Sequence, residues 1–503
     1  MTTTIDWGNP AHYAIALLPE LLLSAWAMML LLLDVFQKGD ASIPSRRSIG
    51  WLALLGILLT AVANGWLLTL DEVAPTGMIA LDEFRVFTNF LFLLAAALFV
   101  LISERYLDQE RMMLGEVYVL VLFAAVGMMF FAGARDLMVA FIGLETMSVP
   151  IYVLAGMNRR DRRSGEGALK YFLLGAFSSA FFLFGVALIY GATHTTLLPM
   201  IAAAAPQQSE NVLFIAGIGL LTVGFAFKVG AVPFHMWTPD AYEGAPAPIT
   251  GFMAAGVKAA AFAAFLRVFL TAFGSMSSTW GQAIFWIAII TMVTANLIAL
   301  VEGNVKRMLA YSSIAHAGYL LVALATGSVM GAASFLFYLV VYTLMTIGAF
   351  AVIFAVGRRG ESRLDLAAYS GLAWERPLIG VVMTIFLLSL AGFPFTGGFI
   401  GKVYILQSAV SNDLVPLAVV LVLASLVSYW YYLRMAWYMW FGEPTAAAAG
   451  AEPINVSGTL KFALVVAAVL VVLIGVLPNE LLRAAEHSAA TLSLDAQAVS
   501  IGR

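Results

Sequence analysis

Short polar segments divide the chain into a succession of long apolar runs. Runs of about 20 apolar residues are what α-helices need to cross the ~30 Å hydrocarbon core of a bilayer, whereas membrane β-strands show about ten residues of alternating character. Only 11% of the 503 residues are charged, and soluble domains carry roughly 25%. These features exclude a water-soluble globule and predict an all-α polytopic membrane protein.

Interruptions by polar, Gly, Pro or charged residues predict about fourteen transmembrane spans. Two of them, 211–249 and 378–410, are interrupted internally. The N-terminal MTTTIDWGNPAHY has no basic region, so we expect the first run to be a retained span and not a cleaved signal peptide. The expected limits are 13–35, 50–70, 82–103, 114–132, 136–157, 165–190, 211–249, 250–271, 280–301, 306–326, 331–357, 378–410, 415–442 and 460–477.

Lys and Arg gather in the connections that follow odd-numbered spans, whereas segments 191–210, 272–280 and 327–331 have none and Arg135 is the main exception. Cytoplasmic loops carry an excess of Lys and Arg, so we expect both termini outside, in the periplasm. The cations are Lys38, Arg46 and Arg47, then Arg105 and Arg111, then Arg159, Arg160, Arg162 and Arg163, then Lys306 and Arg307, and finally Arg358, Arg359, Arg363 and Arg376.

The two interrupted spans share a Pro-Phe pair among small residues, Pro233–Phe234 and Pro394–Phe395. The second pair follows the first by five spans, an odd number, so spans four to eight and nine to thirteen are interpreted as two inverted five-helix repeats. Discontinuous helices at matching positions favour an ion pathway near the bilayer midplane; ordinary packing kinks are the alternative. The expected units are 1–112, 113–272 and 273–443, then 444–503 with the last span and a C-terminal tail.

Ionisable residues at membrane depth are costly and are functional candidates by default. Lys228 lies just before the first break. Glu145 lies midway along the fifth span, and Lys170, about two turns into the antiparallel sixth span, is its expected ion-pair partner. Because lysine responds readily to burial, such a pair could modulate a proton carrier; a static structural pair is the alternative.

Further candidates continue from this pair through both halves of the chain. His235 lies in the first break, Lys258 opens the eighth span, and Lys402 follows the second break. His316 is a possible relay, with Tyr311, Ser312, Ser313 and Tyr319 nearby in the sequence, although a satisfied interior histidine is the simpler interpretation. Asp240 and Glu243 are expected to cap a half-helix, and Arg267 to extend to a membrane interface.

The sequence lacks the residues that several kinds of functional site require. The chain has no cysteine, so disulfides, iron–sulfur clusters and thiolate metal sites are excluded. Its five histidines show no metal-ligand spacing, no nucleotide-binding loop is present, and no basic tract indicates nucleic acid. Three functions remain: a proton-conducting module, a solute transporter and a structural membrane subunit. The two helix breaks, each with a lysine nearby, favour the proton-conducting module.

The chain resembles the antiporter-like subunits of respiratory complex I, the proton-translocating NADH:quinone oxidoreductase, over essentially its whole length. The segments that carry the resemblance are GLETMSVPIYVLAG, EGALKYFLLGAFSSAFFLFG, KVGAVPFHMWTPDAYEGAPAPIT and NVKRMLAYSSIAHAGYLL. The chain is most similar to the bacterial N type, because Lys258 stands in GFMAAGVKAA, Lys402 stands where the M type is expected to have a glutamate, and no long lateral helix is expected after residue 477.

The resemblance implies roles for the candidates. Glu145 and Lys170 would be a modulating pair, Lys228 the central proton carrier, and His235 and Lys258 its link to Lys402. No cofactor is expected in this chain; NAD, FMN, iron–sulfur clusters and quinone would belong to partner subunits. The expected partners are the M-type and small membrane subunits within the bacterial inner membrane. The alternative is a subunit of a multisubunit cation/proton antiporter or a membrane-bound hydrogenase.

Overall fold

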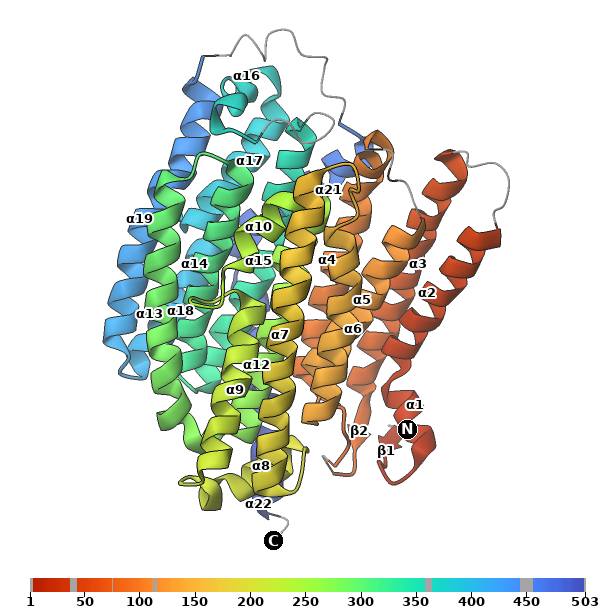
Figure 1. Cartoon of the computed structure of the whole chain (residues 1–503), viewed down its shortest axis with the longest axis vertical. Helices are drawn as coiled ribbons and strands as arrows, with labels where there is room; N and C mark the ends of the chain where they lie inside the picture. The colour runs from red at the N-terminus through yellow and green to blue at the C-terminus, as the bar shows by residue number, and fades with distance from the viewer. Residues whose placement is uncertain are drawn as a thin grey trace.

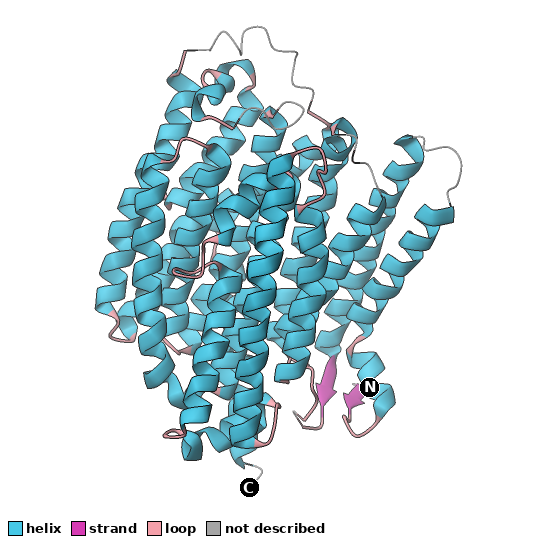
Figure 2. Cartoon of the chain, in the orientation of Figure 1, coloured by secondary structure: helices cyan, strands magenta, loops and turns pink. Residues whose placement is uncertain are grey.

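The computed structural model describes residues 3–36, 43–74, 76–110, 112, 115–357, 364–443 and 456–501. Long helices form a bundle, with the N- and C-terminal ends of the chain at the same end of it (Figure 1). Figure 2 shows two short strands near the N-terminus, β1 (Thr3–Ile5) and β2 (Leu70–Glu72), which pair in parallel. Among the cations used for the orientation, Lys38, Arg111, Arg358, Arg359 and Arg363 and the side chains of Arg46 and Arg47 lie outside the described residues.

Thirteen helical segments of the described chain are long and apolar enough to cross a membrane. The helices concerned are α2 (Leu18–Phe36), α3 (Ile43–Trp66), α4 (Glu83–Gln109), α5 (Gly115–Gly133), α6 (Leu137–Ala155), α7 (Arg162–Thr193), α9 (Val212–Val229), α11 (Ala247–Phe252) continuing through η3 (Met253–Val257) into α12 (Lys258–Ala272), α13 (Ser277–Val301), α14 (Val305–Ala325), α15 (Val329–Val356), α19 (Val415–Phe441) and α21 (Gly458–Val476).

The remaining expected span, 378–410, consists of two 15-residue helices, α17 (Pro377–Ala391) and α18 (Gly397–Ser411). All fourteen spans of the sequence prediction therefore have a helical counterpart. Shorter helices join them, namely α1 (Pro10–Ala16), η1 (Leu67–Thr69), α8 (Leu198–Ala204), η2 (Ala205–Gln208), α10 (Trp237–Gly244), η4 (Gly274–Met276), η5 (Leu366–Tyr369) and α16 (Leu372–Glu375).

Short polar side chains begin many of the long helices. Each accepts a hydrogen bond from a backbone N–H of the first turn, which would otherwise have no partner. In a segment about to enter hydrocarbon this capping also fixes where the helix starts. The capping residues are Asp82, Asp136, Asp161, Asn211, Asn304, Ser328 and Ser457.

Both predicted breaks are present, and both begin at a glycine in the left-handed region. Gly230 (φ 74°) ends α9, and Gly392 (φ 87°) ends α17. A residue with a Cβ atom rarely adopts this conformation. The first break separates α9 from α10 inside the bundle, away from both of its ends (Figure 1). A third irregularity is the π-helical turn η3 directly before Lys258, for which the sequence gives no signal.

Three arginines at the end of the bundle that holds the termini are buried in ion pairs with carboxylates. Arg85 pairs with Glu20 at 2.7 Å, Arg135 with Glu72 at 2.6 Å, and Arg267 with Asp82 at 2.7 Å. Arg267 does not extend to solvent, because its guanidinium is buried against a carboxylate directly before α4. Arg135, the main exception to the loop-charge pattern, is likewise held in an ion pair.

The ion pair with Arg267 changes the pKa of Asp82. Burial alone raises its pKa, but the Arg267 guanidinium outweighs burial and lowers the pKa to about 2. Asp82 caps α4, whereas Arg267 lies on α12, so the pair joins the first three spans to the first expected repeat.

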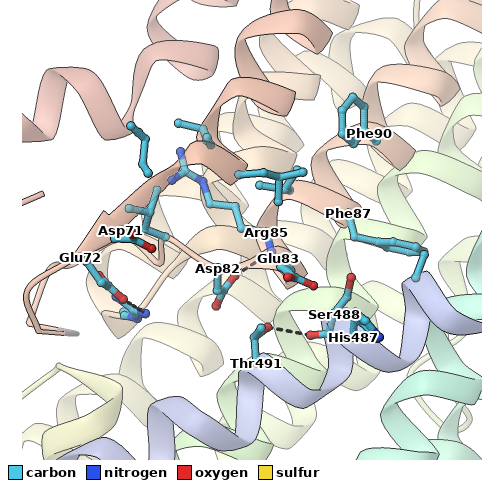
Figure 3. A pocket seen from close by; sticks show the side chains of 17 residues that line it. Asp71, Glu72, Asp82, Glu83, Arg85, Phe87, Phe90, His487, Ser488 and Thr491 are labelled. Atoms are coloured by element: carbon cyan, nitrogen blue, oxygen red, sulfur yellow. Dashed lines mark hydrogen bonds and ion pairs between the residues drawn. The ribbon is translucent and has the colours of Figure 1, made fainter. Parts of the chain in front are cut away.

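The expected C-terminal tail contains a further helix, α22 (Asn479–Ile501), which follows α21. It packs against α15, α4, α12 and α8. A cavity of about 610 Å³ lies between α22, β2 and the start of α4. In Figure 3, His487, Ser488 and Thr491 of α22 face Asp82 and Glu83 across it. None of the predicted site residues lines this cavity.

Candidate functional site

Lys228 lies in the last turn of α9, directly before the break, and is 2% exposed. Its Nζ donates to the Ser148 hydroxyl at 2.7 Å and to the Tyr152 hydroxyl at 3.1 Å, both on α6. The ammonium also lies 5.2 Å from the Tyr152 ring centroid and 5.7 Å from that of Tyr171. Aromatic faces stabilise a desolvated cation, so the lysine is held by neutral groups.

Glu145 is on the same face of α6, one turn before Ser148. Its carboxylate accepts a 2.5 Å hydrogen bond from the Ser179 hydroxyl of α7. Residues three and seven positions apart on a helix share a face. Glu145 therefore neighbours the Lys228 site through Ser148 and Tyr152. These two residues were not among the predicted candidates, although their helical spacing from Glu145 is visible in the sequence.

The expected Glu145–Lys170 ion pair is wrong. Lys170 Nζ instead lies 2.8 Å from Glu166 and 2.8 Å from Asp240 of α10, and its side chain is 45% exposed. The reason is the length of α7, which has 32 residues and extends well past the level of Glu145. Ser179, which does meet Glu145, lies about 14 Å farther along the same helix axis than Lys170.

Asp240 and Glu243 join a larger ionic network at this end of α10. Arg307 of α14 lies 3.0 Å from each of them and 3.4 Å from Glu302. Burial opposes ionisation of Asp240, but hydrogen bonds from Lys170 and Arg307 hold its pKa below the usual value. These carboxylates link α7, α10 and α14, and the expectation that they merely cap a half-helix missed the link.

Lys258 follows the π-helical turn η3 and is 2% exposed. Its Nζ donates to the Ser313 hydroxyl at 2.5 Å and to the Ser313 carbonyl at 2.9 Å. A Cβ on Gly230 would lie 3.7 Å from Lys258 Nζ. Lys258 therefore lies beside the glycine that ends α9, two residues after Lys228.

His316 is buried among tyrosines of two other helices, α15 and α19. Its Nδ1 lies 2.6 Å from the Tyr338 hydroxyl and its Nε2 lies 3.1 Å from the Tyr432 hydroxyl. The Tyr342 hydroxyl donates to Ser313 at 2.7 Å, and the Tyr342 ring lies 5.3 Å from the His316 ring. The predicted neighbours Ser312 and Ser313 take part, Ser312 through Tyr432. The tyrosines of α15 and α19 lie far away in sequence, and no local spacing could have assigned them.

Lys402 is 5% exposed on α18. Its Nζ donates to the carbonyls of Leu390 at 3.0 Å and Ala391 at 2.8 Å, the last residues of α17. The negative end of the α17 dipole thus faces the ammonium. The Tyr319 ring lies 4.8 Å from Nζ and 5.2 Å from the His316 ring.

His235 lies in the first break, as expected, but the structure does not join it to Lys228 or Lys258. Its Nδ1 is buried without a hydrogen-bond partner within the described part of the chain. The link between the two lysines through His235 is therefore not formed by direct contacts.

The candidates thus form a row of three buried lysines with hydroxyl, imidazole and backbone partners. Within the described residues none of the three is paired with a carboxylate. From Lys258 the contacts run through Ser313 and Tyr342 to the His316 ring, and from there through Tyr319 to Lys402. Hydroxyls and imidazole both donate and accept hydrogen bonds. The hydrogen bonds of this path run from Lys258 through Ser313 to Tyr342, and the contacts beyond Tyr342 are between rings or between a ring and the ammonium. The described part of the chain contains no cluster of His, Cys, Asp and Glu that could hold a metal ion.

Comparison with known proteins identifies the family. Residues 134–428 match the family model described as "NADH:quinone oxidoreductase/Mrp antiporter, TM". NADH-quinone oxidoreductase subunit N of Trichlorobacter lovleyi is 46% identical, with 94% of this chain and 96% of that protein covered. Subunit N 1 of Sorangium cellulosum is 44% identical, with 92% and 96% covered.

Solved structures agree with these relatives. A chain of respiratory complex I from Thermus thermophilus with bound aureothin is 36% identical, with a TM-score of 0.78 and 92% of this chain and 98% of that chain covered. A chain of the Mrp complex from Dietzia sp. is 22% identical with a TM-score of 0.83, with 97% and 99% covered, and shares the fold. The chain therefore belongs to the N-type antiporter-like membrane subunits of bacterial NADH-quinone oxidoreductase.

Proposed function

We propose that this chain is a proton-translocating subunit of NADH:quinone oxidoreductase, and that Lys228, Lys258 and Lys402 carry the protons. The observation that carries the proposal is the row of three buried lysines, one near each helix break and one between them. A single buried lysine could be structural. Three in line, all with neutral partners and joined in part by tyrosines and a histidine, match what a proton path requires.

Each residue type has a part in such a path. Lys228 would exchange its proton at Nζ, beside the Ser148 and Tyr152 hydroxyls. Glu145 would modulate that exchange from one turn away, through the electric field of its carboxylate. Ser313, Tyr342 and His316 would relay protons between Lys258 and Lys402, with water completing the steps at which only rings are in contact. His235 would act through water in the first break.

Lys170 takes a different part from the one first expected. It would hold Asp240 at the cation-bearing end of the bundle, next to Arg307. This network would keep α10 aligned with α14 while the protonation of the axis changes.

We further propose the assembly and orientation that the relatives' names suggest. The partners would be the M-type and small membrane subunits, and NAD, FMN, iron–sulfur clusters and quinone would be bound by partner subunits. The protein would lie in the bacterial inner membrane with both termini in the periplasm. Loop charge supports this orientation. Units 1–112, 113–272, 273–443 and 444–503 would be the functional divisions, the last of them including α22.

The test uses the intact complex in proteoliposomes, with Lys228→Ala and Lys228→Arg. Arginine keeps the positive charge but does not release its proton at accessible pH. We expect both variants to assemble, and both to lose most NADH-driven proton pumping. Pumping at the normal level in Lys228→Arg would remove Lys228 from the path. A purified complex without NADH:quinone activity, flavin or iron–sulfur signals would overturn the assignment in favour of an antiporter or hydrogenase subunit.

A further inference from the structure

A groove between α17 and α21 differs in character from the rest of the molecule. It has a volume of about 510 Å³ and is lined entirely by apolar side chains. On α17 the lining residues are Leu378, Val381, Val382 and Ile385, and on α21 they are Val465, Ala468, Val469, Val472, Leu473 and Val476. Several of these side chains are exposed, Val469 by 57% and Leu473 by 47%. The groove is thus open to the surroundings of the bundle.

The length of the groove indicates what kind of molecule could bind in it. Its α21 wall, from Val465 to Val476, extends about 16 Å along the helix axis. This is about half of the ~30 Å hydrocarbon core, which is one leaflet. The length of the groove therefore matches one lipid acyl chain, which extends through one leaflet.

Positive charges near one end of the groove indicate which kind of lipid headgroup would bind there. Lys461 lies one turn before Val465 on the same face of α21, and Arg376 lies directly before α17. Both helices begin after connections that follow odd-numbered spans, so both cations lie at the same side of the membrane. Neither makes an ion pair within the described residues, so both are available to an anion. Cationic pockets between helices at this side attract acidic lipid headgroups.

We propose that the groove between α17 and α21 binds one acyl chain of an anionic phospholipid, whose phosphate lies against Lys461 and Arg376. The site lies on the outside of α17, whose last carbonyls hold Lys402. The proposal rests on the proposed orientation, which places Lys461 and Arg376 on the cytoplasmic side. It does not depend on proton transfer through Lys402.

The experiment uses the complex in native membranes that contain phosphatidylglycerol with a photoreactive diazirine near the end of its acyl chain. After illumination, labelled peptides are mapped by mass spectrometry. We expect label within 378–385 and 465–476. Val469→Trp fills the groove and should reduce this label about five-fold or more, the factor that corresponds to about 1 kcal/mol. Val419→Trp on α19, where Val419 is 52% exposed and lines no part of the groove, should leave the label unchanged.

The headgroup is tested separately. Lys461→Ser should reduce labelling by phosphatidylglycerol about five-fold, the effect of losing one cation near an anionic lipid. Labelling by the matching phosphatidylcholine probe should not change, and Arg160→Ser, an exposed cation in another connection, should have no effect. Equal labelling of all exposed helix faces would overturn the proposal. So would the absence of label from 378–385 and 465–476 when other exposed helix faces are labelled.

Discussion

At the scale of single residues, the unusual feature is that three buried ammonium groups have no carboxylate partner within the described chain. A buried charge must be satisfied by hydrogen bonds or it costs free energy. Here hydroxyls and helix-end carbonyls supply those bonds. Such partners can remain in place when a proton leaves, whereas a carboxylate pair would be left with an uncompensated charge.

The corrected partner of Glu145 leads to a prediction that separates it from Lys170. Glu145→Gln keeps a hydrogen-bonding group beside Ser179 but removes the charge, and should lower coupled quinone reduction about ten-fold, the effect of about 1.4 kcal/mol on a barrier. Lys170→Ala breaks only exposed ion pairs, which contribute about 0–1 kcal/mol each. It should have a much smaller effect on the rate in the same membranes. Equal losses of quinone reduction in the two variants would instead support the Glu145–Lys170 ion pair expected from the sequence.

What the sequence could provide at this scale was a set of candidate residues, not the contacts between them. Charged residues in apolar runs are conspicuous, so all seven candidates could be named. Their contacts depend on helix depth and on tyrosines distant in sequence, such as Tyr338 and Tyr432. Neither can be derived from local spacing.

At the scale of elements, the end of α9 requires glycine. A Cβ on Gly230 would lie 2.9 Å from the Thr238 hydroxyl, and the positive φ costs a residue with a side chain about 1–2 kcal/mol. Gly230→Ala should therefore lower the melting temperature of the complex and reduce pumping, because Lys258 lies beside this residue and Lys228 lies two residues before it.

The matched control is Gly219→Ala in the same helix, where a Cβ meets nothing within 4 Å. It should be neutral or stabilising by about 1 kcal/mol, because alanine favours helix. A loss of stability in the control equal to that of Gly230→Ala would contradict the argument.

The spans and both breaks were predictable because apolar length and Pro-Phe pairs are local signals. Helix α22 was missed because its apolar content is too low for a transmembrane span, so the segment resembled a polar tail. The π-helical turn before Lys258 was missed because MAAGV is compatible with ordinary α-helix.

At the scale of the whole molecule, the Asp82–Arg267 pair joins the first three spans to the rest. Removing one partner of a buried pair costs about 3–5 kcal/mol. Asp82→Ala should therefore lower the thermal stability of the purified complex strongly. Asp82→Leu with Arg267→Met should recover most of it, because no charge is left unpaired. A double variant no more stable than Asp82→Ala would contradict this.

The same pair predicts a dependence on pH. The folded-state pKa of Asp82, about 2, lies below its unfolded value of about 3.9. Its contribution is thus fully present above about pH 4 and is lost as pH falls towards 2. The melting temperature of the wild type should therefore fall more steeply than that of the double variant as the pH is lowered from 6 to 3.

Helix α22 has a consequence for biosynthesis. It follows α4, α8, α12 and α15 in the chain and packs against all four. Because translation proceeds from the N-terminus, none of these contacts can form until the earlier helices have been inserted into the membrane. The end of the bundle that carries both termini is therefore closed late, after the lysine row is already enclosed by its own helices.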